Sequence, residues 1–153
     1  MHKLLFVCLG NICRSPTAHA VMRTKARAQK LPLYIDSAGT SASHRGHPPD
    51  NRSQQVALAA GYDCTGLASR PVKDTDFAYY DLILAMDKDN LQELRHRCPK
   101  PYQHKLQLFL HAHTDYPAVA EVPDPYYGGI RGFEQVLMLI EQGCDAILQR
   151  YYR

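Results

Sequence analysis

The chain has 153 residues and a formal net charge of +3, and 45% of its residues are hydrophobic while 22% are charged. This size and composition are typical of one globular domain, which we expect to span residues 1–153. No apolar run reaches the roughly 18 residues of a membrane helix, and the Lys and Arg residues are scattered, so we expect neither a membrane nor a nucleic-acid partner.

Short apolar segments alternate with helical patterns along the chain. In chain order these predict a strand at 4–7, a helix opening at Ser15-Pro16, a strand at 33–38, a helix at 54–60, a strand at 81–85, a helix at 89–97, a strand at 105–110 and a helix at 133–151. A long loop rich in Pro, Gly and Tyr is expected at 117–132.

This alternation predicts an α/β fold, in which a four-stranded parallel sheet is flanked by helices on both faces. Ligands of such sheets bind at the carboxyl ends of the strands, so the loop after the first strand is the expected site.

The cysteines favour a reducing compartment. Five cysteines without a clear secretory signal indicate free thiols rather than a disulfide framework, and we expect a cytoplasmic location.

A cysteine followed by any five residues and an arginine occurs three times, and only the context separates the matches. Cys144 to Arg150 falls inside the last predicted helix, whose amides are already hydrogen-bonded. Cys64 to Arg70 follows no strand and precedes Pro71. Only Cys8 to Arg14 lies between a strand and a helix, where backbone amides and the helix dipole can surround a tetrahedral anion.

The loop from Cys8 to Arg14 has the chemistry of a nucleophile site. Gly10 is expected to allow a tight backbone, Arg14 to bind two phosphate oxygens, and the positive field to favour the thiolate of Cys8 over the thiol. The alternative is a buried core thiol. Ser15 could cap the helix, donate its hydroxyl to the sulfur of Cys8, or do both.

A carboxylic acid is needed to protonate a leaving group, and Asp124 is the best candidate. It lies in Val-Pro-Asp-Pro-Tyr-Tyr-Gly-Gly, where Tyr126 and Tyr127 could line the mouth of a pocket. The alternative is a simple turn with packed tyrosines.

These motifs together resemble the low-molecular-weight protein tyrosine phosphatase family. The resemblance rests on VCLGNICRSP at 7–16 and DPYYG at 124–128, and IDSAG, PPD and AMD follow in family order at 35–39, 48–50 and 85–87. It covers essentially the whole chain and implies a flavodoxin-like three-layer architecture.

The resemblance implies a complete reaction without a metal or an organic cofactor. Cys8 attacks the phosphorus of phosphotyrosine or a small aryl phosphate, Arg14 holds the phosphate, and Asp124 protonates the leaving oxygen. Asp124 then acts as the base when water hydrolyses the phosphocysteine. The implied partners are phosphotyrosine-containing proteins, with inorganic phosphate or oxyanion inhibitors binding in the same site.

The resemblance also assigns roles around the nucleophile. The implied substrate-binding residues are Leu9, Gly10, Asn11, Ile12, Cys13, Ser15, Tyr126 and Tyr127. Asn11 and Ser37 match positions that hold the loop in shape, and Cys13 matches a cysteine that can form a reversible disulfide with the nucleophile.

Two positions depart from the family pattern. A histidine that often joins the loop-shaping network is replaced by Leu67, and the aromatic residue that often walls the pocket is replaced in a segment that offers Ser43 and His44. We therefore expect a rearranged network and an altered substrate preference.

Two other functions fit parts of this pattern. A thiol-dependent arsenate reductase shares the fold and anion loop, but its additional cysteine after the third strand is missing from residues 85–90. A non-catalytic phosphotyrosine-binding module would be expected to have lost Cys8, Arg14 or Asp124, and all three are present.

Overall fold

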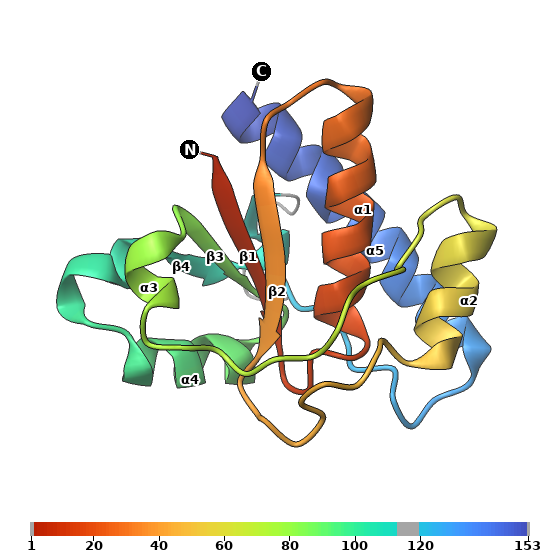
Figure 1. Cartoon of the computed structure of the whole chain (residues 1–153), viewed down its shortest axis with the longest axis horizontal. Coiled ribbons are helices and arrows are strands. Elements are labelled where there is room, and N and C mark those ends of the chain that lie inside the picture. Colours follow the sequence, from red (N-terminus) through yellow and green to blue (C-terminus); the bar gives the residue numbers. More distant parts are fainter. Residues whose placement is uncertain (1, 113–119, 153) are drawn as a thin grey trace.

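A parallel sheet forms the centre of the molecule, for which the computed structural model describes residues 2–112 and 120–152 (Figure 1). Within these residues the sheet has four strands in the order β2-β1-β3-β4. The strands are β1 (Lys3–Cys8), β2 (Tyr34–Gly39), β3 (Leu82–Ala85) and β4 (Leu106–Leu108). All three strand pairs are parallel, which confirms the predicted sheet.

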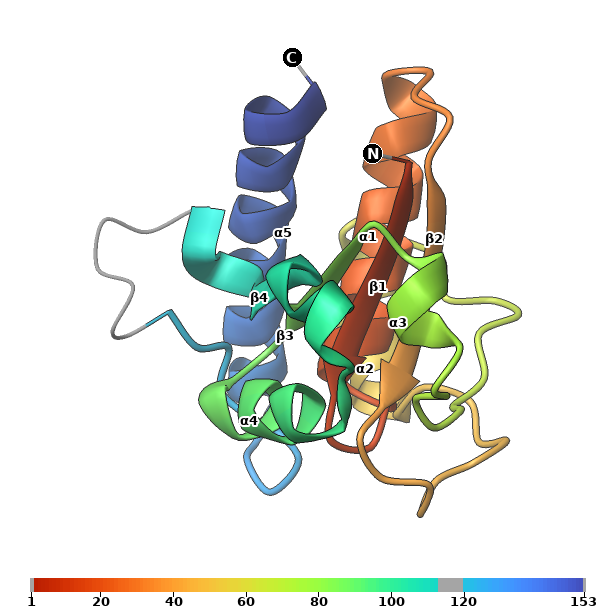
Figure 2. The same ribbon diagram turned by 90° about the vertical axis from the view of Figure 1, so that its left-hand side faces the viewer.

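Helices cover both faces of this sheet, as predicted. The helices are α1 (Arg14–Ala28), α2 (Asn51–Ala59), α3 (Asp76–Tyr79), α4 (Lys88–Arg97) and α5 (Ile130–Tyr152). Figures 1 and 2 show α1, α2 and α5 on one side and α3 and α4 on the other, with α1 and α5 running alongside each other.

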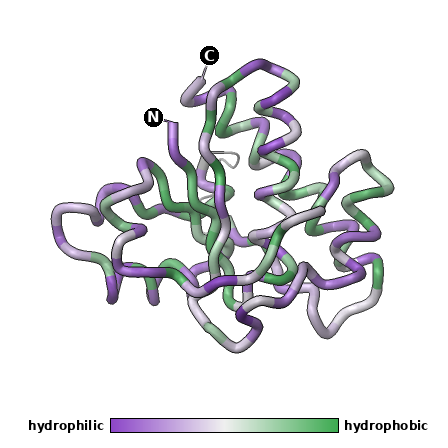
Figure 3. Tube along the Cα trace, viewed as in Figure 1, coloured by the Kyte–Doolittle hydropathy of each residue, from purple (hydrophilic) through white to green (hydrophobic). Residues whose placement is uncertain are grey.

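The central strand supplies the middle of the core. Leu4, Leu5, Phe6 and Val7 of β1 have no exposed surface, and Figure 3 shows hydrophobic residues along the inner strands. Full burial of each such side chain contributes about 1.5–3 kcal/mol. The register pairs Cys8 with Gly39, so the loops after β1 and β2 leave the sheet at the same edge.

The structure changes several predicted boundaries. β4 ends at Leu108 because Phe109–Ala112 turns into a 3-10 helix that contacts α5, and Lys100–Lys105 forms another before the strand. α3 was not predicted, since four residues are too short for a periodic pattern. The loop predicted at 117–132 ends earlier, at the start of α5, and residues 117–119 lie outside the described residues.

The last helix is amphipathic and packs its apolar face against the rest of the chain. Val136, Ile140, Cys144 and Ile147 are buried along one side, at the predicted spacing. In the described part of the chain, no helix has both the length and the apolar character that crossing a membrane requires.

Gly143 is required by packing, and we expect Gly143→Ala to destabilise the fold by about 1–3 kcal/mol, even though alanine favours helices. An added Cβ would lie 2.6 Å from Cζ of Phe109 and 3.0 Å from Cδ2 of Leu110. Urea unfolding measures the change. Gly132→Ala in the same helix is the control, because its Cβ would meet Pro125 at an ordinary 3.6 Å; equal stability of the two variants would contradict this account.

Candidate active site

The sulfur of Cys8 lies at the end of β1, at the start of a loop that we call the phosphate loop (residues 8–14). The backbone N–H of Asn11 donates to Cys8 Sγ at 3.3 Å, and the backbone N–H of Ser15 does so at 3.5 Å. Ser15 Oγ is 3.0 Å from the same sulfur. Two backbone N–H groups and one hydroxyl therefore converge on this one sulfur atom.

The tight backbone of the loop is carried by a different residue from the one predicted. Asn11 has a φ of 55°, whereas Gly10 is not among the residues with positive φ. Asparagine tolerates this left-handed conformation better than most residues. Gly10 instead leaves room for a neighbour, because an added Cβ would lie 2.9 Å from Cδ2 of His44.

Of the two roles considered for Ser15, the structure shows only the contact with the sulfur. α1 begins at Arg14 with Cys13 as its N-cap, so Ser15 lies inside the first turn and the predicted capping role is wrong. Its hydroxyl accepts a hydrogen bond from Asn11 Nδ2 at 2.7 Å. The Ser15 hydroxyl is thereby held between Asn11 and Cys8.

Arg14 is buried and held by two acceptors. Its Nη1 donates to Asp87 Oδ2 at 2.6 Å and to the carbonyl oxygen of Val122 at 3.0 Å. Burial works against the charge, but the Cys8 thiolate and the Asp87 carboxylate raise the pKa of Arg14 above its ordinary value. A permanently charged guanidinium with a fixed orientation suits the binding of a phosphate.

Asp87 is a functional candidate that the sequence analysis missed. Its Oδ1 caps α4 by accepting the N–H of Asn90 at 2.8 Å, which leaves Oδ2 for Arg14. Asp87 follows β3, and the rule that ligands bind at the carboxyl ends of parallel strands is the signal that could have found it.

Asp124 lies across the pocket from the phosphate loop. Its side chain is 45% exposed, and its Oδ2 is 3.8 Å from Nη2 of Arg14. Its Oδ1 accepts the backbone N–H of Tyr126 at 3.0 Å, which orients the carboxyl group. Val122 joins this segment to the sheet, since its N–H donates to the carbonyl of Met86 at 2.8 Å.

One pocket of about 380 Å³ brings these groups together. Its lining residues are Cys8, Leu9, Gly10, Ile12, Cys13, Arg14, Ser41, Ser43, His44, Asp124, Tyr126 and Tyr127. Asn11 and Ser15, which were expected to bind substrate, are not lining residues and contact Cys8 instead.

An imidazole stands at the wall where the sequence suggested that an aromatic residue was missing. His44 lies against Gly10, and its ring centroid is 6.3 Å from that of Tyr126. Tyr127 is 96% exposed, and its ring lies 5.0 Å from that of Tyr126. The mouth of the pocket is therefore built from rings and is suited to an aromatic leaving group.

Cys13 belongs to the phosphate loop, and its side chain is buried. Burial, together with the nearby carboxylate of Asp50, raises the pKa of the Cys13 thiol to about 12. Cys13 therefore stays a neutral thiol at physiological pH and is a poor nucleophile itself. All five cysteines are free thiols.

The two other cysteine–arginine matches serve the fold. Cys144 lies within α5 and is fully buried. Arg70 makes ion pairs with Asp36 at 3.0 Å and with Asp76 at 2.9 Å, and Cys64 is buried. Neither Arg70 nor Arg150 is among the residues that line the pocket.

Ser37, expected to shape the loop, contacts a histidine that the sequence analysis did not consider. Ser37 Oγ is 3.4 Å from Nδ1 of His19, which is 7% exposed. Burial lowers the pKa of His19 from 6.5 to about 4, although Asp36 opposes this change. Leu67, which stands where the family often has a histidine, instead packs against the hydrophobic core.

Acidification is expected to destabilise the fold through His19. Because the pKa of His19 falls from 6.5 to about 4 on folding, the unfolded chain binds more protons between these values. Stability should therefore decrease as the pH falls from 6.5 to 4, by about 3 kcal/mol in total. The free energy of unfolding should depend less on pH in His19→Asn; identical pH curves for the variant and the parent chain would contradict this expectation.

Comparisons with known proteins agree along the chain. A family model described as low molecular weight phosphotyrosine protein phosphatase matches residues 3–153. The protein-tyrosine-phosphatase YfkJ of Bacillus subtilis is 39% identical over 150 residues, covering 97% of this chain and 94% of that protein.

Solved structures give the same result. A protein tyrosine phosphatase of Entamoeba histolytica with Hepes in the active site is 43% identical, covers 98% of this chain and 96% of its own, and has a TM-score of 0.92. A structure described as a Drosophila arginine phosphatase is 34% identical. The match covers 99% of this chain and 98% of that chain, with a TM-score of 0.92. The chain therefore belongs to the family of low molecular weight phosphotyrosine protein phosphatases, which are phosphoric monoester hydrolases.

Proposed function

We propose that this chain hydrolyses phosphotyrosine in proteins, and small aryl phosphates, through a phosphocysteine formed on Cys8. The observation that carries the proposal is that Cys8, Arg14 and Asp124 line one pocket whose mouth is formed by aromatic rings. The pocket thus joins a nucleophile, a phosphate-binding cation and a candidate acid.

In the first step, the Cys8 thiolate attacks phosphorus in line with the departing tyrosine oxygen. The S–P bond forms as the P–O bond breaks, and the proton of Asp124 passes to the phenolic oxygen. Arg14 and the amides of the phosphate loop stabilise the charge on the equatorial oxygens. The dipole of α1, which begins at Arg14, adds to the same field.

In the second step, water attacks the phosphocysteine and regenerates the thiolate. The Asp124 carboxylate takes the proton of the water, so this one side chain acts as acid and then as base. Ser15 Oγ, 3.0 Å from Cys8 Sγ, donates to the leaving thiolate and assists its departure. Inorganic phosphate is released from the site that the phosphoryl group occupied.

The substrate is tested with peptides that differ only in the phosphorylated group. We expect the purified chain to hydrolyse a phosphotyrosine peptide in preference to the phosphoserine peptide, because the rings at the mouth of the pocket accept a phenyl group. Phosphoarginine is the second comparison, because one relative is described as an arginine phosphatase. A preference for phosphoserine or phosphoarginine would overturn the proposed specificity.

The same preparation distinguishes the other two functions. Arsenate reduction with a thiol donor, without phosphate release from the peptide, would indicate a reductase. Binding of phosphate without turnover would indicate a phosphotyrosine-binding module. Vanadate, which mimics the five-coordinate phosphorus of the transition state, should inhibit hydrolysis if the phosphate loop is the site.

Two further properties complete the proposal. A disulfide between Cys13 and Cys8 under oxidation would protect the nucleophile reversibly, and peptide mapping after peroxide treatment tests it. The five free thiols support a reducing, cytoplasmic environment. Residues 1–153 would form one phosphatase domain.

A further inference from the structure

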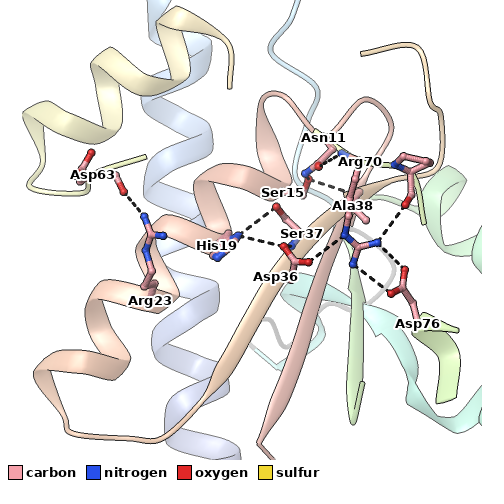
Figure 4. Close-up of polar contacts among 11 residues, drawn as sticks. Asn11, Ser15, His19, Arg23, Asp36, Ser37, Ala38, Asp63, Arg70 and Asp76 are labelled. Carbon is pink, nitrogen blue, oxygen red and sulfur yellow. Dashed lines mark hydrogen bonds and ion pairs between the residues drawn. The ribbon is translucent and has the colours of Figure 1, made fainter. Parts of the chain in front are cut away.

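Polar contacts connect the phosphate loop to Arg70, which lies in the segment between α2 and α3, as Figure 4 shows. Oδ1 of Asn11 accepts the backbone N–H of Arg70 at 3.1 Å, and Nδ2 of Asn11 donates to Ser15 Oγ at 2.7 Å. Ser15 Oγ lies 3.0 Å from Cys8 Sγ. The position of the Arg70 backbone therefore sets the side chains that hold the sulfur.

Arg70 is itself fixed by two carboxylates. Its Nη1 and Nη2 donate to Asp76 at 2.9 Å and 3.2 Å, and its Nε donates to Asp36 Oδ2 at 3.0 Å. These carboxylates raise the pKa of Arg70 although burial opposes the charge. Asp36 belongs to β2, so it links Arg70 to the sheet.

His19 reaches this set of contacts from α1. Its Nδ1 is 3.4 Å from Ser37 Oγ and 3.9 Å from Asp36 Oδ1. The same Oδ1 accepts the backbone N–H of Ser37 at 2.8 Å. A single imidazole nitrogen therefore faces a hydroxyl and a carboxylate that stand next to each other in β2, as Figure 4 shows.

We propose that His19 is a positioning residue for the phosphate loop. Nδ1 of His19 holds the hydroxyl of Ser37, whose backbone N–H donates to Asp36 Oδ1. Asp36 in turn orients Arg70, and the Arg70 backbone sets Asn11 and Ser15 against the nucleophile. His19, on α1, thereby supplies the polar contact in the loop-shaping network that Leu67 cannot make.

An imidazole that only fills space is the competing explanation, and the geometry separates the two. Filling requires volume, which leucine supplies, whereas positioning requires a polar atom at Nδ1. Asparagine places an amide nitrogen close to the position of Nδ1, while glutamine carries its amide one bond further out. At position 19, leucine therefore restores only the volume, asparagine restores a polar atom near Nδ1, and glutamine places that atom too far out.

The test compares His19→Leu, His19→Asn and His19→Gln. We expect His19→Leu to lower kcat with para-nitrophenyl phosphate by about 10-fold, because the groups around the nucleophile lose their alignment. Its dissociation constant for vanadate, measured by calorimetry, should rise by a similar factor. His19→Asn should recover most of the kcat and most of the vanadate affinity, and His19→Gln should recover neither. The control His96→Leu, on the exposed surface of α4, should resemble the parent chain.

The inference fails if His19→Leu binds vanadate as tightly as the parent chain. It also fails if His19→Asn and His19→Leu lose activity equally, in proportion to their loss in thermal unfolding temperature. The activity readout rests on the proposed function, but vanadate affinity does not. A parent chain without turnover, whose vanadate affinity still follows the His19 series, would refute the proposed function and support the positioning role.

Discussion

Cys8→Ser is expected to abolish hydrolysis of para-nitrophenyl phosphate, with a decrease in kcat of about 10⁴-fold or more. The serine hydroxyl is a far weaker nucleophile than a thiolate, and the three donors around Cys8 Sγ do not supply a base to activate it. Steady-state kinetics across pH 4 to 8 measures the loss.

The same variant should still bind phosphate or vanadate, because Arg14 and the loop amides remain in place. Retained binding separates loss of the nucleophile from loss of the fold. Cys64→Ser is the matched control, since Cys64 is also a buried thiol that precedes an arginine by the same spacing, yet it lies outside the pocket. If Cys8→Ser keeps full activity, or if Cys64→Ser is equally inactive, the assignment of the nucleophile is wrong.

Asp124→Asn is expected to lower kcat by about 10² to 10⁴-fold, the contribution of a positioned general acid. The amide keeps the size of the side chain and can still accept the N–H of Tyr126, but it has no proton to donate. Because the effect concerns the leaving oxygen, it should be larger for phosphotyrosine than for para-nitrophenyl phosphate, whose leaving group is more acidic.

This dependence on the leaving group distinguishes acid catalysis from a structural effect. Asp89→Asn, on the exposed surface of α4, is the control and should leave both rates unchanged. A uniform loss in Asp124→Asn that is the same for both substrates would argue against Asp124 as the acid and for a role in shaping the pocket.

The sequence predicted the central sheet and the nucleophile loop because both depend on local patterns. β1 is an unbroken apolar run, and the residues that surround Cys8 Sγ follow it within the same segment. Asp124, far along the chain, was a candidate acid from its Asp-Pro-Tyr-Tyr segment and was assigned that role by resemblance, and the pocket brings it to Cys8.

The features that the sequence did not predict depend on neighbours distant in the chain. Asp87 acquires its role through contact with Arg14, and β4 is cut short because Phe109 turns toward Gly143 of α5. The polar neighbours of His19 come from β2. The helix pattern alone therefore could not show whether His19 is a hydrogen-bond partner of Ser37 or a core residue. Positive φ at Asn11 rather than at Gly10 is likewise set by the contacts of the asparagine side chain.

The central claim is a covalent intermediate on Cys8, and trapping it is the most direct test. The parent chain is mixed with excess para-nitrophenyl phosphate, quenched in acid within the first turnovers, digested and analysed by mass spectrometry. We predict the added mass of one phosphoryl group on the peptide that contains Cys8, and none in Cys8→Ser. A phosphoryl group on another residue, such as His44 at the mouth of the pocket, or turnover without any adduct at Cys8, would contradict the account.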